Sequence, residues 1–287
     1  MKILVSGAAG FVGSHLVQQM RAEHEVYAVA RAPLDLPGVH WISHDLTRPL
    51  DEAALPAHVD VVVHLAQSRR YREFPEQAAD VFGVNVGSTL ALLDYARRVG
   101  AVRFIYASTG GIYGAGDRAF RESDPPAQNL GFYPASKQAG ELLVNSYRAF
   151  FQTTLCRFFF VYGRRQNESM LMPRLVQSVR NADPITLQGE DGIRINPIHV
   201  ADAVDAVARC LSLDEHEVFN IGGGEVLTLR AIADKIGRIV GRDPVFARLD
   251  RPPTNLVGDI SKMKALLGAP RVDLEEGLRQ LCAPGDA

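Results

Sequence analysis

The sequence predicts an α/β fold built on a doubly wound parallel sheet, followed by a smaller C-terminal α/β lobe. Strand-like and helical segments alternate through the first half, the strand-like segments are mostly apolar, and a glycine-rich turn joins the first strand to a helix. Apolar strands indicate a sheet covered on both faces. Repeated strand–helix–strand units place the ligand at the carboxyl ends of the strands. These features together predict a Rossmann-type sheet.

Composition excludes several classes of protein. The 287 residues contain 47% hydrophobic residues and carry a net charge of -2, without a basic stripe that would bind nucleic acid. No apolar run is long enough to span a membrane, and the first residues already form the strand of the glycine motif, so we expect no signal peptide. The three cysteines are few and far apart, which indicates reduced thiols of a cytoplasmic protein. The histidines and cysteines lack metal-ligand spacing, and we expect no metal.

The alternation of elements sets the expected domains. Expected strands of the first half are Ile3–Val5, Glu25–Ala30, Val39–Ile42, Val59–Leu65, Val102–Ala107 and Thr154–Phe160. Expected helices are Val12–Arg21, Phe82–Arg98 and Lys137–Phe151. In the second half we expect helices at Met172–Asn181, Leu229–Val240 and Leu274–Leu281, a helix ending near Leu213, and a strand at Glu217–Ile221. We therefore predict a nucleotide-binding domain over 1–160, to which about 193–213 returns, and a substrate-binding lobe over 161–287.

The glycine-rich turn has the context of a dinucleotide site. Gly7, Gly10 and Gly13 follow the first strand and open the first helix. Gly7 allows the tight turn, Gly10 lets a pyrophosphate approach the backbone, and Gly13 lets the helix lie close to the sheet. The helix N-terminus, at Phe11 and Val12, offers unpaired N–H groups to the phosphates. The alternative is a plain strand-to-helix turn.

The ends of the second and third strands bear on the choice of cofactor. The acidic residue expected to bind the ribose 2′-hydroxyl is absent, since Ala30 takes its place. Arg31 can instead pair with a 2′-phosphate, which favours NADP over NAD; the alternatives are a solvated Arg31 and Asp35 reaching back. Asp45, before Leu46, can accept a hydrogen bond from adenine or can be a helix N-cap.

Two further segments are expected to contact the cofactor. Leu65, Ala66 and Gln67 end the fourth strand with small or apolar residues, over which ribose and pyrophosphate can pass. Asn85 lies in the predicted long helix and needs partners if buried. A cofactor or the adjacent strand can supply them.

Tyr133 and Lys137 carry the strongest chemical signal. Their spacing of four places both on one helix face, where the ammonium can lower the pKa of the phenol. Such a phenol can exchange a proton with a sugar hydroxyl. The alternative is a half-buried tyrosine beside an exposed lysine. Ser108 and Thr109 end the fifth strand, where either hydroxyl can hold a substrate oxygen or bond its own backbone.

These segments resemble the extended short-chain dehydrogenase/reductase family, in its nucleotide-sugar epimerase/dehydratase group. The motifs that carry the resemblance are Gly7-x-x-Gly10-x-x-Gly13, Asp45-Leu46, His64-Leu65-Ala66, Asn85, Tyr106-Ala107-Ser108-Thr109, Tyr113-Gly114, Tyr133-x-x-x-Lys137, Arg157, Val161-Tyr162-Gly163, Ile198-His199-Val200-x-Asp202, Phe219-Asn220-Ile221-Gly222-Gly223 and Leu266-Leu267-Gly268. The resemblance implies catalysis by Thr109, Tyr133 and Lys137, a cofactor contact at Phe159, and a nucleoside diphosphate sugar as substrate. It also implies a homodimer.

Some positions depart from the family pattern. The Asp-Glu pair of dehydratases is replaced by Gly110-Gly111, which argues against loss of water. Phe160 stands where the family has an Asn at the substrate. Ile195 follows Arg194, which is one position before the usual phosphate-binding arginine. Ser108, Thr109, Phe160 and Arg194 are the expected substrate contacts.

The predicted reaction is NAD(P)-dependent epimerisation by hydride transfer at C4 of the sugar, like that of a UDP-glucose 4-epimerase. The alternative is an NADPH-dependent 4-ketoreductase, which the same Tyr-Lys pair would serve and which Arg31 favours. A non-catalytic NADP sensor fits less well, because such proteins usually lose the tyrosine and the lysine. A metal hydrolase lacks ligands in this sequence.

Overall fold

The computed structural model describes residues 1–32 and 34–283, which divide into two compact units. The first unit comprises Met1–Ile112, Pro125–Arg157 and Val204–Phe219. The second comprises Tyr113–Asp124, Phe158–Ala203 and the chain from Asn220 onward. Each unit is built from segments that are far apart in the sequence.

A seven-stranded sheet forms the centre of the first unit, in the order β11-β6-β5-β4-β1-β2-β3. Its strands are β1 (Lys2–Ser6), β2 (Glu25–Ala30), β3 (Val39–Ser43), β4 (Val61–His64), β5 (Arg103–Thr109), β6 (Gln152–Phe158) and β11 (Glu217–Ile221). β1 pairs in parallel with β2 and with β4, and the pairs β2–β3 and β4–β5 are parallel as well. The predicted Rossmann-type sheet is confirmed.

The strand order reverses between β1 and β4. From β1 the chain builds outward to β2 and β3, then returns to place β4 on the other side of β1. Such a switch point leaves a crevice at the carboxyl ends of the two strands, where α/β proteins bind ligands. Ser6 lies directly opposite His64 at this point.

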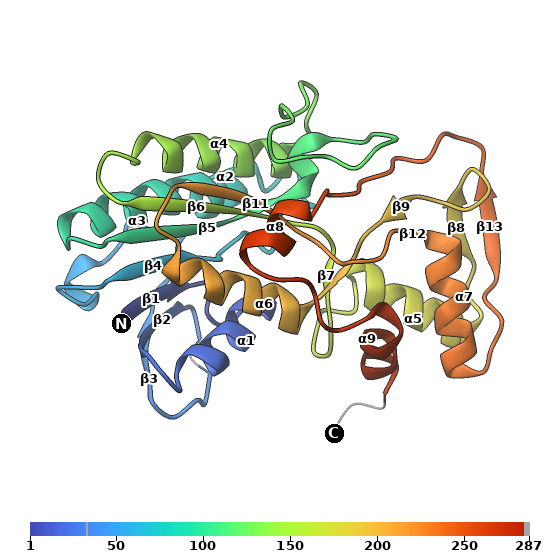
Figure 1. Cartoon of the computed structure of the whole chain (residues 1–287), viewed down its shortest axis with the longest axis horizontal. Helices are drawn as coiled ribbons and strands as arrows, with labels where there is room; N and C mark the ends of the chain where they lie inside the picture. Colours follow the sequence, from blue (N-terminus) through green and yellow to red (C-terminus); the bar gives the residue numbers. More distant parts are fainter. Residues whose placement is uncertain (33, 284–287) are drawn as a thin grey trace. The chain divides into compact units, whose positions relative to one another are not determined.

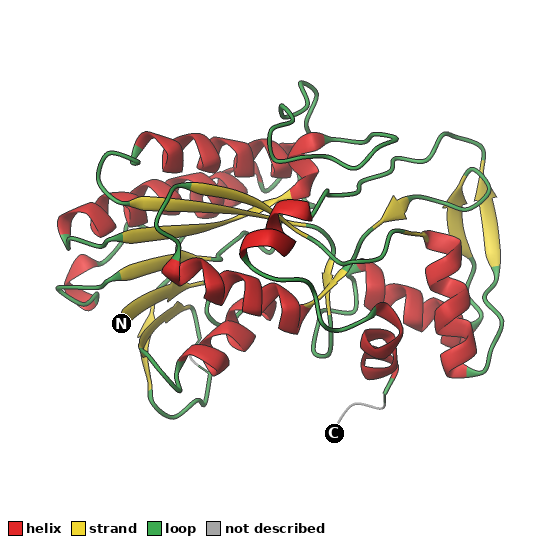
Figure 2. Ribbon diagram, in the orientation of Figure 1, coloured by secondary structure: helices red, strands yellow, loops and turns green. Residues whose placement is uncertain are grey.

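Helices cover both faces of the sheet, as Figures 1 and 2 show. One face carries α2 (Ala78–Phe82), α3 (Ser88–Arg98) and α4 (Phe132–Ser146), and the other carries α1 (Phe11–Met20) and α6 (Val200–Arg209). The short helices η1 (Glu52–Ala54), η3 (Gly110–Tyr113) and η4 (Cys210–Ser212) are of the 3-10 type, and η2 (Gly83–Gly87) is a π-helix between α2 and α3.

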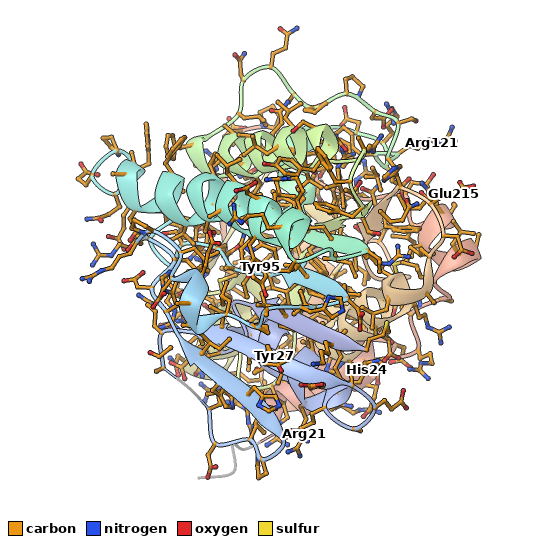
Figure 3. All side chains as sticks on the ribbon, turned by 90° about the vertical axis from the view of Figure 1, so that its left-hand side faces the viewer. Arg21, His24, Tyr27, Tyr95, Arg121 and Glu215 are labelled. Carbon is orange, nitrogen blue, oxygen red and sulfur yellow. The ribbon has the colours of Figure 1, made fainter. Side chains whose placement is uncertain are left out.

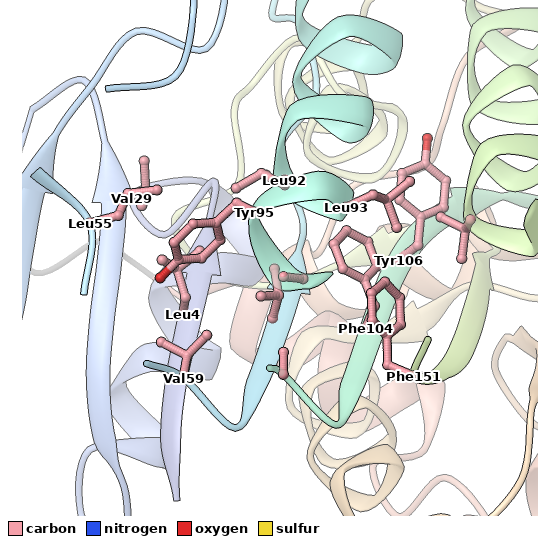
Figure 4. Packing of buried hydrophobic residues seen from close by; sticks show 14 of the residues in the cluster. Leu4, Val29, Leu55, Val59, Leu92, Leu93, Tyr95, Phe104, Tyr106 and Phe151 are labelled. Carbon is pink, nitrogen blue, oxygen red and sulfur yellow. The ribbon is translucent and has the colours of Figure 1, made fainter. Parts of the chain in front are cut away.

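The core of the first unit lies between α3 and the sheet. Leu92 and Leu93 of α3 are fully buried and point toward strand residues such as Leu4 and Phe104 (Figure 4). Tyr95, which is labelled in Figure 3, is also buried. Its hydroxyl donates to the carbonyl oxygen of Pro56 at 2.7 Å. The apolar strands predicted from the sequence are apolar because both of their faces are covered.

The second unit has its own core and three two-stranded sheets. Its strands are β7 (Val161–Tyr162), β8 (Ile185–Gln188), β9 (Arg194–Ile195), β10 (Ile198–His199), β12 (Leu227–Thr228) and β13 (Phe246–Leu249). Its helices are α5 (Leu171–Asn181), α7 (Leu229–Val240), α8 (Ser261–Leu266) and α9 (Leu274–Cys282). Apolar faces of α5, α7 and α9 pack together in this core.

Two of the predicted helices were wrong in detail. The helix expected to begin at Lys137 begins at Phe132, because Pro134 occupies its first turn, where no intrahelical N–H is needed. The single helix expected over Phe82–Arg98 is α2, η2 and α3 in succession. The π-helix contains one residue more per turn than an α-helix, and hydrophobic spacing alone does not predict such an insertion.

The two units also differ from the predicted boundaries. Tyr113–Asp124 groups with the second unit because the Tyr113 hydroxyl donates to Asn220 at 2.9 Å and Phe120 N–H bonds Val257 at 2.8 Å. Of the segment expected to return to the first domain, only the part from Val204 does so. The role of the second unit as a substrate-binding lobe stays a prediction.

Within residues 1–32 and 34–283, no helix is both long and apolar enough to cross a membrane.

Candidate active site

The glycine turn after β1 requires glycine for steric reasons. Gly7 has a φ of +72°, and a Cβ there would lie 2.7 Å from the Cα of Ala66. A Cβ on Gly13 would lie 2.2 Å from the carbonyl oxygen of Gly7, and one on Gly10 would lie 3.0 Å from that same oxygen. At Gly7 and Gly13 only hydrogen fits while the turn, β4 and α1 keep this spacing, and at Gly10 a Cβ would make a tight contact.

The first turn of α1 is open to an anion. Helix α1 begins at Phe11, and its N-cap is Gly10, which has no side chain to cap the helix. The amides of Phe11, Val12 and Gly13 are first-turn donors, which have no intrahelical acceptor. Together with the positive end of the helix dipole, they fit the pyrophosphate of a dinucleotide.

The ends of β2 and β3 lie beside each other. Asp45 accepts hydrogen bonds from the N–H and hydroxyl of Thr47 at 3.0 and 2.9 Å. These bonds, with smaller contributions from Arg31 and Arg48, lower the pKa of Asp45. Asp45 and Leu46 lie in a turn, so the helix N-cap interpretation of Asp45 was wrong. Arg31 is exposed.

The segment after β4 contacts both the turn and α4. Leu65 N–H donates to Ser6 at 3.1 Å, which continues the β1–β4 pairing. The backbone of Ala66 is the surface that excludes a side chain at Gly7. Gln67 accepts a hydrogen bond from the Tyr133 hydroxyl at 2.8 Å. The segment Leu65–Gln67, which we expect to contact the cofactor, therefore connects the glycine turn with Tyr133.

Lys137 is buried beneath α4 rather than exposed. Its side chain is 1% accessible, and Nζ donates to the carbonyl oxygens of Ala107 and Ala66 at 2.9 and 3.3 Å. The ring of Tyr106 lies under the ammonium, with its centroid 5.0 Å from Nζ. Burial lowers the pKa of Lys137 to about 7, so the lysine changes charge near neutral pH.

Helix α4 approaches the sheet closely enough to hold Lys137 there. A Cβ on Gly140 would lie 2.1 Å from the hydroxyl oxygen of Tyr106, which is fully buried. The missing side chain at 140 therefore gives room for the tyrosine that supports the lysine.

The expected lowering of the Tyr133 pKa by Lys137 is not what the structure shows. Desolvation raises the pKa of Tyr133 above its usual range, and Tyr71 raises it further, while a hydrogen bond with Thr109 lowers it in part. The rings of Tyr71 and Tyr133 are 4.8 Å apart. Because Lys137 is itself buried and donates to two carbonyl groups, it does not depress the phenol pKa in this arrangement.

Two hydroxyl groups at the end of β5 face this region. Thr109 accepts a hydrogen bond from the N–H of Gly111 at 3.1 Å, which is the turn geometry weighed as an alternative, and it also bonds Tyr133. Ser108 is 4% accessible, and its hydroxyl has no hydrogen-bond partner in the described part of the chain. A buried unpaired hydroxyl at a strand end fits a ligand oxygen.

Asn85 is fully buried in the π-helix and bonds protein groups. Its Oδ1 accepts from the Ser68 N–H at 3.0 Å, and its Nδ2 donates to the Ser136 hydroxyl at 2.9 Å. Asn85 therefore ties the segment after β4 to the helix that carries Tyr133. A direct contact with the cofactor stays a prediction.

The remaining predicted residues belong to the second unit. Phe159 is buried, with its ring stacked on Tyr113 at 6.2 Å, and Phe160 has a left-handed backbone with φ of +47°. Arg194 donates to the carbonyl oxygen of Asp117 at 2.6 Å. The ring of Phe159 therefore packs within its unit, and the contacts of Phe159, Phe160 and Arg194 with ligands stay predictions.

The structure thus brings Thr109, Tyr133 and Lys137 together in the first unit, and adds residues that sequence reasoning missed. Tyr71 follows no recognisable motif and contacts Tyr133 only through folding. Tyr106 was noted only as part of a family motif. It lies in β5, two residues before Ser108 and therefore on the same face of the strand, and this spacing was the signal that could have placed it near the site. His64 is a polar residue in an otherwise apolar strand. Because a buried polar side chain needs hydrogen-bond partners, this position was a signal in the sequence that the His64 ring is hydrogen-bonded.

Comparisons with known proteins identify the family of this chain. A family model described as the NAD dependent epimerase/dehydratase family matches residues 3–222. A probable UDP-glucuronate 4-epimerase of Rhizobium meliloti is 27% identical, covering 97% of this chain and 95% of its own.

Solved structures are similar over nearly their whole length. The UDP-glucuronic acid 4-epimerase of Bacillus cereus, in complex with UDP-glucuronic acid and NAD, is 28% identical with a TM-score of 0.88, covering 98% of this chain and 97% of its own. The dTDP-glucose 4,6-dehydratase DesIV of Streptomyces venezuelae, with NAD bound, is 26% identical with a TM-score of 0.84, covering 98% and 96%.

Proposed function

The chain belongs to the NAD dependent epimerase/dehydratase family, as predicted from its motifs, and we propose that it is an NAD-dependent 4-epimerase of a UDP-sugar. Relatives of this chain include UDP-glucuronate and UDP-glucose epimerases, and one of the solved structures holds both NAD and the sugar nucleotide. Since the family also contains dehydratases of similar structure, the choice between the two reactions depends on the side chains around Tyr133.

One observation carries the choice of epimerase over dehydratase. Thr109 and Tyr133 are in contact, and the two residues after Thr109 are Gly110 and Gly111. A dehydratase needs a base to take the proton from the carbon next to the oxidised one, and an acid to protonate the hydroxyl that leaves as water from the carbon beyond it. The glycines supply neither, while Tyr133 and Thr109 supply the proton transfer and the hydrogen bond that accompany hydride transfer between C4 and NAD.

Each side chain of the site has its own part in the reaction at C4. NAD, when bound, supplies a hydride acceptor and later a hydride donor. The phenolate of Tyr133 takes the proton of the C4 hydroxyl and later returns it. The Thr109 hydroxyl holds that oxygen, and the unpaired Ser108 hydroxyl is a second donor for the sugar.

Lys137 has two consequences for this mechanism. Its pKa of about 7 makes its charge sensitive to what binds beside it, and the ribose hydroxyls or the charge of NAD would change that environment. A ribose hydroxyl that accepts a hydrogen bond from the Lys137 ammonium would favour the charged form of the lysine. The ammonium would then favour the phenolate of Tyr133, which desolvation alone disfavours.

We propose NAD as the resident cofactor, because an epimerase consumes no reductant and a relative's structure holds NAD. The preference for NADP inferred from Arg31 remains the competing proposal. Arg31 is exposed and lies near Asp45. If its guanidinium pairs with a 2′-phosphate it favours NADP, and if it pairs with the Asp45 carboxylate it leaves NAD equally acceptable.

The test is to incubate the purified protein with UDP-glucose and with UDP-glucuronate and to separate the C4 epimers chromatographically. We expect one of them to reach an equilibrium mixture without added cofactor, and denatured protein to release NAD. An empty protein that consumes NADPH stoichiometrically with a 4-keto sugar nucleotide would identify the alternative 4-ketoreductase. Absence of any reaction with a sugar nucleotide, in protein loaded with NAD, would refute both.

We also propose a cytoplasmic homodimer. Cys156, Cys210 and Cys282 are free and buried thiols, which fits a reducing compartment. Phe82, Leu90 and Leu142 on α2, α3 and α4 are apolar and 47–65% accessible, which supports packing of these helices against a second copy.

Leu142→Glu should convert the dimer to a monomer, because a charge would be buried in the interface. Light scattering after gel filtration measures the mass. Val102→Glu is the control, since Val102 is 61% accessible but lies outside these helices. A wild-type monomer at micromolar concentration would refute the dimer.

A further inference from the structure

A series of buried and partly buried hydrogen bonds runs from the residue before the glycine turn to Tyr133. The Ser6 hydroxyl, directly before Gly7, lies 2.5 Å from Nδ1 of His64. The other ring nitrogen of His64 lies 2.9 Å from the hydroxyl of Thr89, at the start of α3. All three residues are fully buried.

The series continues through the π-helix into α4. The Thr89 hydroxyl donates to the carbonyl oxygen of Asn85 at 2.8 Å. The side chain of Asn85 donates to Ser136 at 2.9 Å, and Ser136 donates to the carbonyl oxygen of Tyr133 at 2.7 Å. Five hydrogen bonds therefore connect the phosphate-binding turn with the backbone of the proposed acid/base residue.

The direction of each bond can be worked out from the number of protons. A carbonyl oxygen only accepts, so Thr89 uses its single proton on Asn85 and must accept from His64. Nε2 of His64 therefore carries a proton. Burial, reinforced by the charge of Lys137, lowers the pKa of His64 to about 3 and keeps the ring neutral, so Nδ1 is bare and accepts from Ser6.

We propose that Ser6, His64 and Thr89 are positioning residues, whose hydrogen bonds fix the glycine turn relative to the Tyr133–Lys137 pair so that hydride and proton transfer occur in register. This inference rests on the proposed function for its kinetic consequence. The transfers need the nucleotide and the phenol to be placed together, and a misplacement of about 1 Å costs up to about 100-fold in rate. A buried hydrogen-bonded network holds such a spacing more specifically than apolar contacts do.

Thr89→Val is the decisive variant, because it keeps the shape of the side chain and removes both hydrogen bonds. We expect kcat for the UDP-sugar to fall about tenfold, with KM and the Kd for NAD changed by less than about twofold. Thr89→Ser keeps the hydroxyl and should restore most of kcat.

Thr153→Val is the matched control. Thr153 is a buried threonine near the amino end of β6, and its hydroxyl lies 3.2 Å from Nδ1 of His216. Its loss removes a similar threonine–histidine contact away from the site, and kcat should stay unchanged. Equal losses of kcat in Thr89→Val and Thr153→Val, or no rescue in Thr89→Ser, would overturn the proposal.

Two measurements need no turnover. In wild-type protein, 15N chemical shifts of His64 should show a neutral ring protonated at Nε2, and a ring protonated at Nδ1 would contradict the direction of the series. With 13C-labelled lysine, the titration midpoint of Lys137 should rise in Thr89→Val, because a displaced α4 admits water, and should stay near the wild-type value in Thr153→Val.

These readouts separate failure of the positioning role from failure of the proposed function. Wild-type protein that is loaded with NAD yet inactive on every UDP-sugar would refute the function alone. In that case, an unchanged Lys137 titration in Thr89→Val would refute the positioning role, and a raised midpoint would support it.

Discussion

The glycine turn and the Tyr133–Lys137 pair are built by different means, although both belong to the first unit. The turn is mostly local: its three glycines lie within seven residues, Gly10 and Gly13 are crowded by the carbonyl oxygen of Gly7, and only Gly7 meets a distant residue, Ala66. The pair depends on distant segments, because Lys137 donates to Ala66 and Ala107 and Tyr133 donates to Gln67. The proposed cofactor-binding turn thus depends mainly on a short stretch of sequence, while the proposed acid/base pair depends on tertiary packing.

Tyr133→Phe should show the largest effect. It removes the proton-transferring oxygen but leaves the turn intact, so kcat should fall roughly 100- to 10,000-fold while the Kd for NAD changes little. Epimer formation and calorimetric NAD binding measure the two quantities. A variant with wild-type turnover would show that another group moves the proton.

Gly7→Ala should act on the turn instead. A left-handed φ costs a residue with a Cβ about 1–2 kcal/mol, and the contact with Ala66 adds about 1–3 kcal/mol of overpacking. We expect lower unfolding free energy and weaker NAD binding, both measured on purified protein.

Gly100→Ala isolates the first of these costs. Gly100 has a φ of +69°, and an added Cβ there meets nothing within 4 Å. If Gly7→Ala and Gly100→Ala destabilise equally, the close approach of Ala66 to the turn has no energetic weight.

Lys137 should make stability depend on pH. Its pKa is about 7 in the folded protein and about 10.4 when unfolded, so between these values the unfolded state binds more protons. The unfolding free energy of the ligand-free protein should therefore rise with pH from about 7 to about 10, by up to about 1.4 kcal/mol per pH unit.

Lys137→Met provides the comparison for this slope. The methionine does not titrate, so the difference in unfolding free energy between variant and wild type should shrink or change sign as pH rises. Denaturant unfolding at several pH values measures it. A pH-independent difference would mean that Lys137 is not buried as the structure has it.

Arg31→Ala should have the smallest effect. An exposed guanidinium contributes modestly to phosphate binding, so NADP should weaken by up to about tenfold and NAD hardly at all. Equal affinities of wild-type protein for the two cofactors would remove the proposed role of Arg31 in selecting NADP.

Sequence alone predicted the features that depend on residues close together in the chain. The sheet, the glycine turn and the spacing of Tyr133 and Lys137 follow from local pattern. The first turn of α4 was missed because Pro134 and its neighbours interrupt the apolar period. The π-helix at Gly83–Gly87 was missed because the bonds that stabilise its inserted residue are the tertiary hydrogen bonds of Asn85, and the local sequence does not show these partners.

Charge states were harder to predict than positions. The spacing of Tyr133 and Lys137 suggested a lowered phenol pKa, but burial controls both groups and moves each toward its neutral form. The bonds of His64 join it to Ser6 and Thr89, which lie 58 and 25 residues away. A single sequence does not reveal such partners.

Gly140 gives an engineer a means to alter the chemistry without touching any group that meets a ligand. Its missing side chain sets how deeply Tyr106 seats below Lys137. A change of side-chain volume at Gly140 or Tyr106 should therefore change how deeply the Lys137 ammonium is buried, and with it the pKa of Lys137. We therefore expect the spacing between α4 and β5 at Gly140 to influence the pKa of Lys137.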